Sequence, residues 1–240
     1  MKNEDIFRPI DFNFDQNIIL KDLVKMDLFK KSSITTIAYE NGRSIIDTDN
    51  FFESYDDVTH YDENGNLIQK KYNTYVIYNF THLPIVSESE NESFVNASSG
   101  GYRGKRPIWH VYDTAWSWKE NTPQSLIDTV NELDLEYISC VRLVGQIPPS
   151  KGIVHADSNF KENLKYFKNG GVSITLNVTH GGGHLQYRYK EKLHTIDESK
   201  YKCWHFNDAL QHRTTEITSP RVQIRVFGKR KYGNTKYGNY

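Results

Sequence analysis

Residues 171–180, GVSITLNVTH, alternate between apolar and polar side chains, and this alternation restricts the folds open to the chain. In a β-strand, Val172, Ile174, Leu176 and Val178 would lie on one face and the polar residues between them on the other. Three further short β-forming segments follow, HLQYRY, YKCWHFN and RVQIRVFG. Short strands separated by glycine-rich turns predict a mainly β fold with flanking helices, built as a sandwich or a barrel.

Two segments with helical spacing precede these strands. Residues 16–31, QNIILKDLVKMDLFKK, place apolar side chains three and four positions apart, which indicates an amphipathic helix. Residues 123–133, PQSLIDTVNEL, predict a second helix, with Thr122 as its N-cap and Pro123 in its first turn.

The length of 240 residues fits one domain, which changes of composition divide into parts. We expect an N-terminal elaboration in residues 1–106, a β core in residues 107–228 and a flexible tail in residues 229–240. Residues 87–106 are rich in Ser, Asn and Gly and predict a long mobile loop. Such a loop is either a linker or a lid over a site, and both interpretations stay open.

The charge balance gives no reason to expect a nucleic acid or a membrane as partner. Lys and Arg together number 30, as do Asp and Glu, so the formal net charge is zero. The chain shows neither a leader pattern nor an apolar run of membrane-spanning length, so we expect a cytoplasmic protein. Cys140 and Cys203 lie in apolar runs and are interpreted as reduced core cysteines, with a disulfide as the alternative.

His155 and Asp157, in GIVHADSNF, stand one residue apart after a Pro-Pro-Ser turn. On a strand they share a face, where an imidazole and a carboxylate form a hydrogen-bonded pair, a salt bridge or half of a metal site. A metal site needs a further ligand, for which His212 is the first candidate and His205 the fallback. Two histidines and one carboxylate match the facial triad that holds Fe(II) with open coordination positions. The segment THGGGH (179–184) predicts instead a tight hairpin with both histidines exposed.

Arg221, Gln223 and Arg225 share one face of RVQIRVFG, and apolar residues occupy the other face. A polar face with two arginines fits a barrel whose interior binds an anion. A guanidinium binds a carboxylate through two parallel hydrogen bonds, a geometry that lysine lacks. Arg221 is therefore the candidate anchor for a carboxylate ligand, with Arg225 as its competitor.

Residues 137–228 resemble the double-stranded β-helix core (jelly-roll, cupin-like) of Fe(II)/2-oxoglutarate-dependent dioxygenases, and most closely the aspartyl/asparaginyl β-hydroxylase branch. The similar segments are VRLVGQIPPSKGIVHAD, GVSITLNV and CWHFNDALQHRTTEITSPRVQIRVF. The resemblance implies that His155, Asp157 and His212 bind Fe(II). It also implies that Arg221 binds the distal carboxylate of 2-oxoglutarate, and that O₂ is the other co-substrate.

Further site residues follow from the same resemblance. Ser173 stands where some members of the branch carry a basic residue, so Ser173 and Thr175 are candidates for the co-substrate's other carboxylate. Asn177, Arg225 and Trp116 are weaker candidates for contact with substrate, and core packing is the alternative for the tryptophan. The reaction implied is hydroxylation of an unactivated C–H, in an amino-acid side chain of Asp/Asn or Pro type. The substrate would be a peptide, a protein or a free amino acid.

Three alternatives stay open. One is the same chemistry on a nucleobase or other small molecule, another a non-catalytic cupin-like barrel that binds a metal or ligand, and the third a zinc hydrolase. Motifs for a serine nucleophile, a P-loop or a dinucleotide site are absent from the sequence. Arg221 distinguishes a 2-oxoglutarate enzyme from a non-catalytic metal-binding barrel, because the enzyme needs this arginine and the barrel does not.

Overall fold

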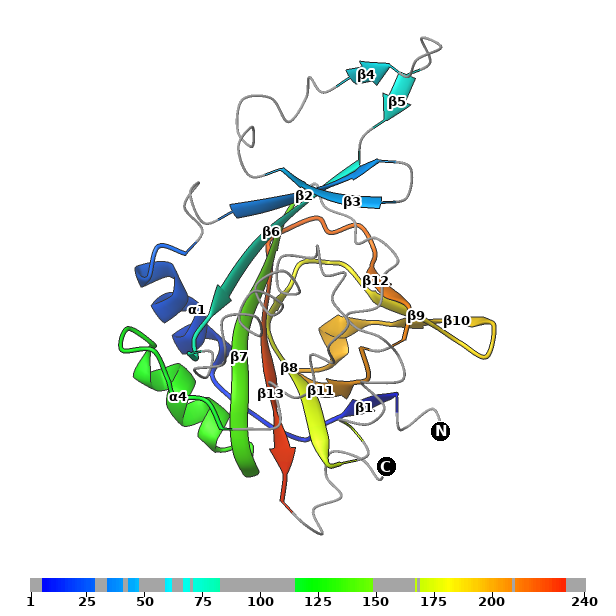
Figure 1. Ribbon diagram of the computed structural model, residues 1–240. Coiled ribbons are helices and arrows are strands. Elements are labelled where there is room, and N and C mark those ends of the chain that lie inside the picture. The colour runs from blue at the N-terminus through cyan, green and yellow to red at the C-terminus, as the bar shows by residue number, and fades with distance from the viewer. Residues whose placement is uncertain are drawn as a thin grey trace, which may run out of the picture.

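The computed structural model describes residues 6–28, 34–40, 43–47, 59–61, 67–69, 71–82, 115–148, 167, 169–208 and 210–231 (Figure 1). His155, Asp157 and the predicted loop 87–106 lie outside these residues, as does the chain from residue 232. Neither helix α1 nor helix α4 in the described part combines the length and the hydrophobicity needed to span a bilayer.

An eight-stranded antiparallel sheet, here called the major sheet, joins strands from both ends of the chain (Figure 1). Its order is β1 (Phe7–Pro9), β11 (Cys203–Phe206), β8 (Gly171–His180), β13 (Arg221–Arg230), β7 (Leu135–Ile147), β6 (Lys71–Asn79), β2 (Ile34–Glu40) and β3 (Arg43–Asp47). β13 therefore runs between β8 and β7, and it continues two residues beyond the predicted end of the core at residue 228.

Two smaller sheets complete the strands of the described part. The minor sheet has the order β10 (Lys192–Ile196), β9 (Leu185–Tyr189) and β12 (His212–Thr214), and β4 (Thr59–Tyr61) pairs with β5 (Leu67–Gln69). Every strand pair is antiparallel. The prediction of a mainly β fold with few helices is confirmed, whereas the double-stranded β-helix stays a prediction.

Helix α1 (Gln16–Lys25) begins where Asp15 caps it, accepting hydrogen bonds from the backbone N–H groups of Asn17 (2.9 Å) and Ile18 (3.1 Å). It ends at Lys25, and Asp27 then adopts a left-handed backbone with φ of 53°. The predicted continuation of this helix through residues 26–28 is therefore wrong, because this backbone conformation is incompatible with a continuing helix, and residues 29–31 lie outside the described residues.

Helix α4 (Gln124–Asn131) is shorter than predicted, and Pro123 rather than Thr122 is its N-cap. The hydroxyl of Thr122 instead donates to the carbonyl of Phe80 at 3.0 Å. The predicted cap is wrong because the hydroxyl serves the contact between this segment and the end of β6.

The major sheet has an apolar outer face and a polar inner face. The outer face packs on helices α1 and α4 through one hydrophobic cluster, which includes Ile19, Leu23, Leu126, Val130, Leu143, Val172, Ile174, Leu176, Val178, Val222, Ile224 and Val226. The inner face carries the buried polar residues Gln146, Ser173, Thr175, Asn177, Arg221 and Gln223. The alternation predicted for residues 171–180 and 221–226 is thus confirmed, with the helices covering the apolar side.

A second hydrophobic cluster joins β11 to the minor sheet. Trp204 and Phe206 pack there with Leu185, Tyr187 and Leu210. Trp204 is in register with Thr175 of β8, so this cluster lies on the inner side of the major sheet. The minor sheet therefore faces the polar inner surface and screens it from water.

Both cysteines are free and buried, as predicted. Burial raises the pKa of the Cys140 thiol above its usual range, which keeps it protonated and unreactive.

Candidate functional site

His212 lies on β12 of the minor sheet and is buried. Its Nδ1 lies 2.8 Å from the carbonyl oxygen of Leu210, and its ring packs edge-on against Phe206 with centroids 5.1 Å apart. A carbonyl only accepts hydrogen bonds, so Nδ1 carries the proton and the lone pair of the ring is on Nε2. The hydrogen bond from Nδ1 to a backbone carbonyl fixes the tautomer and the ring orientation, and it is typical of histidines that bind a metal through the other ring nitrogen.

His205, the fallback ligand, points to the other side of the major sheet. It pairs in register with Ile174, which faces the helices, while its neighbours Trp204 and Phe206 belong to the inner cluster. Its ring lies edge-on to Phe167, with centroids 5.5 Å apart. His205 cannot therefore share an inner-face site with His212, and its use as third ligand is wrong.

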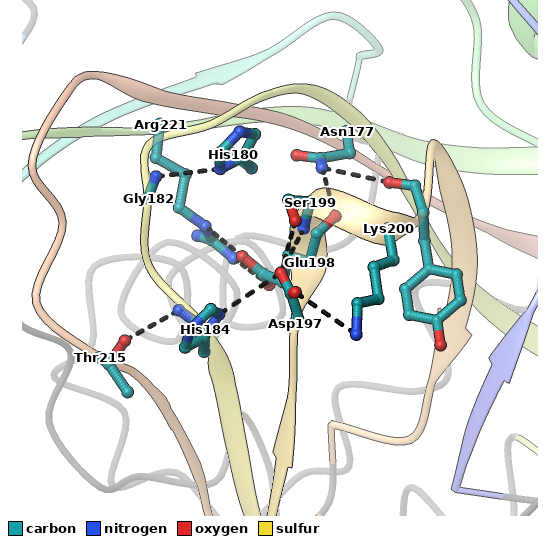
Figure 2. Close-up of polar contacts among 11 residues, drawn as sticks. Asn177, His180, Gly182, His184, Asp197, Glu198, Ser199, Lys200, Thr215 and Arg221 are labelled. Atoms are coloured by element: carbon teal, nitrogen blue, oxygen red, sulfur yellow. Dashed lines mark hydrogen bonds and ion pairs between the residues drawn. The ribbon is translucent and has the colours of Figure 1, made fainter.

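Arg221 begins β13 on the inner face, and a carboxylate of the chain itself already occupies it (Figure 2). Its Nε donates to Oε2 of Glu198 at 2.9 Å, and its Nη2 donates to Oε1 at 2.7 Å. Its Nη1 donates to Oε1 of Gln146 at 2.8 Å. The side chains of Arg221 and Glu198 are 7% and 1% exposed, so the pair is buried. Arg221 was predicted from the sequence as a carboxylate anchor, whereas its partner Glu198 was not predicted.

Arg225 is also paired with an acid. Its Nη2 donates to Oδ2 of Asp208 at 2.7 Å and to the hydroxyl of Ser173 at 3.0 Å. That hydroxyl in turn donates to Asp208 at 3.3 Å. The predicted doubly basic face is therefore neutralised by Glu198 and Asp208, and Ser173 supports an internal ion pair.

The remaining predicted contact residues have structural partners. Thr175 is buried in register with Trp204 and Arg225. The side-chain amide of Asn177 donates to the carbonyls of Glu198 (3.0 Å) and Tyr201 (3.2 Å), and so holds the 3-10 helix η3 (Glu198–Lys200) in place (Figure 2). A substrate contact for Asn177 stays a prediction, as it does for Trp116, which is buried.

Two buried glutamine side chains lie close to Arg221 on the inner face. Among the described residues, the amide nitrogens Nε2 of Gln146 and of Gln223 are buried without a hydrogen-bond partner. Gln146 is the register partner of Arg221 on β7, and Gln223 lies two residues along the same face of β13. Unpaired buried donors are costly, and a carboxylate bound beside Arg221 would satisfy them.

The metal ligand set is described only in part. His212 is the one member of the predicted triad within the described residues, and those residues contain no group of three or more His, Cys, Asp or Glu side chains placed to hold a metal ion. His155 and Asp157 therefore stay predictions. The tautomer of His212 fits the role that the triad assigns to it.

The segment THGGGH connects β8 of the major sheet to β9 of the minor sheet, so the predicted tight hairpin is wrong, because these two strands do not pair with each other. His180 is exposed, and its Nδ1 accepts from the backbone N–H of Gly182 at 3.0 Å. His184 is partly exposed, with its Nδ1 3.7 Å from Oδ1 of Asp197 (Figure 2).

Replacing Gly181 with alanine is expected to destabilise the fold by about 1–3 kcal/mol, because Gly181 has φ of +67° and no room for a side chain. An added Cβ would lie 2.7 Å from Cβ of Arg221 and 2.8 Å from the carbonyl oxygen of Ser219. Chemical denaturation measures the loss. Gly170→Ala is the matched control, since Gly170 has φ of +88° but its Cβ would meet nothing closer than 3.6 Å. Equal losses in the two variants would show that the contact with Arg221 does not matter.

Comparison with known proteins gives likenesses among solved structures only. No protein family matches the chain, and no curated protein matches it. A prolyl-4-hydroxylase of Pseudomonas putida aligns with 45% of this chain and 59% of its own, at 16% identity and a TM-score of 0.29. A 2OG-Fe(II) oxygenase family oxidoreductase of Burkholderia pseudomallei aligns with 69% and 73%, at 12% identity and a TM-score of 0.35.

The Escherichia coli ribosomal oxygenase YcfD is similar over 92% of this chain and 46% of its own, at 10% identity and a TM-score of 0.39. This chain thus spans about half the length of that oxygenase and of the prolyl-4-hydroxylase. Because these identities and TM-scores are low, they do not assign the chain to a family, and a functional assignment depends on the residues of the inner face.

Proposed function

We propose that this protein is an Fe(II)- and 2-oxoglutarate-dependent dioxygenase that hydroxylates an unactivated C–H. His155, Asp157 and His212 would hold the iron, and Arg221 the distal carboxylate of the co-substrate. The observation that carries the proposal is the inner face itself, where, within the described residues, the buried Arg221 stands beside a buried amide nitrogen of Gln146 that lacks an acceptor. Such an unpaired donor is costly in a protein core, and a carboxylate ligand set beside it would supply the acceptor.

The protein's part in the reaction is to bind, orient and exclude water, while bound Fe(II), 2-oxoglutarate and O₂ supply the oxidising chemistry. The contact with Leu210 selects the tautomer of His212 in which Nε2, the nitrogen proposed to bind the metal, carries the lone pair. The cluster of Trp204, Phe206 and Tyr187 keeps this end of the inner face dry. An amino-acid side chain of Asp/Asn or Pro type is the proposed substrate, with a small molecule as the alternative.

A non-catalytic ligand- or metal-binding barrel is the second candidate. The ion pair between Arg221 and Glu198 favours it, since the arginine already has a carboxylate partner within the fold. The two candidates differ in whether added 2-oxoglutarate reaches the metal.

Anaerobic protein mixed with Fe(II) and 2-oxoglutarate is expected to show a visible metal-to-ligand charge-transfer band that requires both components. His212→Ala should abolish the band, because it removes the Nε2 ligand, while His180→Gln should keep it because His180 is the exposed last residue of β8. Absorption spectroscopy under nitrogen makes the measurement. Tight Zn²⁺ binding with no band would favour a hydrolase. Fe(II) binding with no spectral change on addition of 2-oxoglutarate would favour the non-catalytic barrel.

A further inference from the structure

The arginine proposed to anchor 2-oxoglutarate is held by a carboxylate from the protein's own chain. We propose that Glu198 is an internal competitor for this anchor, so that the co-substrate binds Arg221 only when the Glu198 carboxylate leaves it. The inference rests on the proposed function and adds to it a residue that sets the affinity and specificity of the carboxylate site.

The contact geometry makes Glu198 a mimic of the ligand. Its two oxygens take one hydrogen bond each from Nε and Nη2 of Arg221, at 2.9 and 2.7 Å (Figure 2). This is the two-bond arrangement in which guanidinium groups recognise carboxylates. A third N–H of Arg221 donates to Oε1 of Gln146 at 2.8 Å. Three of the five N–H donors of the guanidinium are therefore already hydrogen-bonded and would have to be shared with, or released to, a co-substrate carboxylate.

Charge makes the two occupants exclusive. The side chain of Glu198 is 1% exposed, so a second carboxylate on the same guanidinium would face it in a poorly solvated interior, where like charges repel strongly. Arg225 does not offset this repulsion between the two carboxylates. It lies four residues along β13, which is about 13 Å of strand, and it is bonded to Asp208 at 2.7 Å.

The main chain of Glu198 is held independently of its side chain. The carbonyl of Glu198 accepts from Asn177 at 3.0 Å and from the N–H of Tyr201 at 3.2 Å, and Asp197 caps η3 through the N–H of Ser199 at 3.1 Å. These contacts do not involve the Glu198 carboxylate. In the proposed exchange η3 therefore stays in place, and only the side chain of Glu198 leaves Arg221.

A second observation points to an external ligand at this place. Nε2 of Gln146 is buried and has no acceptor among the described residues, although Oε1 of the same amide is bonded to Arg221. Glu198 satisfies the guanidinium but leaves this neighbouring donor unpaired. A co-substrate carboxylate set between Arg221 and Gln146 would satisfy both, which gives it an advantage over the internal carboxylate.

The test is isothermal titration of the full Mn(II)-loaded chain with 2-oxoglutarate. Glu198→Gln keeps the size and one acceptor oxygen of the side chain but removes the competing charge, so the affinity should rise about tenfold to a hundredfold. Glu198→Asp retains the charge and shortens its reach, and should produce a smaller rise in the same direction. It also serves if Glu198→Gln fails to fold.

Asp197→Asn is the matched control, because it removes a neighbouring charge that is 36% exposed and whose side chain is hydrogen-bonded to Ser199. Its affinity should stay within about twofold of the parent.

Arg221→Lys separates failure of this inference from failure of the proposed function. If the Glu198 variants bind 2-oxoglutarate no better than the parent while Arg221→Lys loses binding, Glu198 supports the anchor and the competitor role is overturned. If Arg221→Lys binds as well as the parent, Arg221 is not the anchor and the proposed co-substrate site is wrong. Absence of binding in the parent and in every variant would overturn the proposed function itself.

Discussion

Replacing Arg221 with alanine is expected to lower the free energy of unfolding by about 3–5 kcal/mol, because it leaves Glu198 as a buried charge without its partner. The two side chains are 7% and 1% exposed, so water cannot compensate for the loss. The same variant is expected to lose 2-oxoglutarate binding. Denaturant titration at neutral pH measures the first effect, and calorimetric titration measures the second.

Two controls separate the buried charge from the lost side chain. The double replacement Arg221→Met with Glu198→Leu removes both charges and should recover most of the stability, though not the binding. Lys200→Ala, on the same short helix but with a side chain 68% exposed, should change stability by less than about 0.5 kcal/mol. A loss below about 1 kcal/mol in Arg221→Ala would contradict the buried ion pair.

Lowering the pH is expected to destabilise the protein through His205, at up to about 1.4 kcal/mol per pH unit between pH 6.5 and about 3. Burial lowers the pKa of His205 to about 3, and the positive charges of Arg8, Arg225 and Arg230 act in the same direction. The folded protein therefore keeps His205 neutral, while the unfolded chain takes up a proton below pH 6.5. The stabilisation is complete above that pH and is lost as the pH falls toward 3.

Denaturation midpoints across this pH range measure the effect. His205→Gln removes the titrating group and should flatten the dependence, at some cost in packing against Phe167. His180→Gln is the matched control, since His180 is exposed and its replacement should leave the slope unchanged. An unchanged slope in His205→Gln would assign the acid sensitivity to other groups.

The faces of β8 and β13 could be predicted from the sequence because a period of two depends only on the strand itself. This period was enough to place Ser173, Thr175 and Asn177 on one face of β8, and Arg221 and Arg225 on one face of β13. The side that the helices cover was also implied by its apolar character.

The acids that neutralise these arginines could not be predicted in the same way. Glu198 lies in the polar stretch TIDESKYK and Asp208 in a short turn, so neither position belongs to a periodic pattern. Both are buried by contacts made across the fold, which local sequence does not encode. The face of the sheet on which His205 lies could not be predicted either, since it depends on which face of β11 carries Trp204 and Phe206.

Helix ends show a similar limit. The apolar spacing in residues 16–31 continues past Lys25, but the left-handed backbone at Asp27 stops the helix. Thr122 is a residue type that favours N-caps, yet its hydroxyl bonds to Phe80. At Thr122 the local preference is overruled by the contact with Phe80, and after Lys25 it is overruled by the backbone conformation of Asp27.

His212 belongs to the minor sheet and Arg221 to the major sheet, so the proposed site is divided between two layers that meet through side chains. A ligand held at both residues would act as a clamp between the layers, and unfolding would have to break it before the layers part. Metal and co-substrate would then slow the unfolding rate as well as shift the equilibrium. Resistance to proteolysis, and with it the lifetime of the protein, would depend on the supply of both.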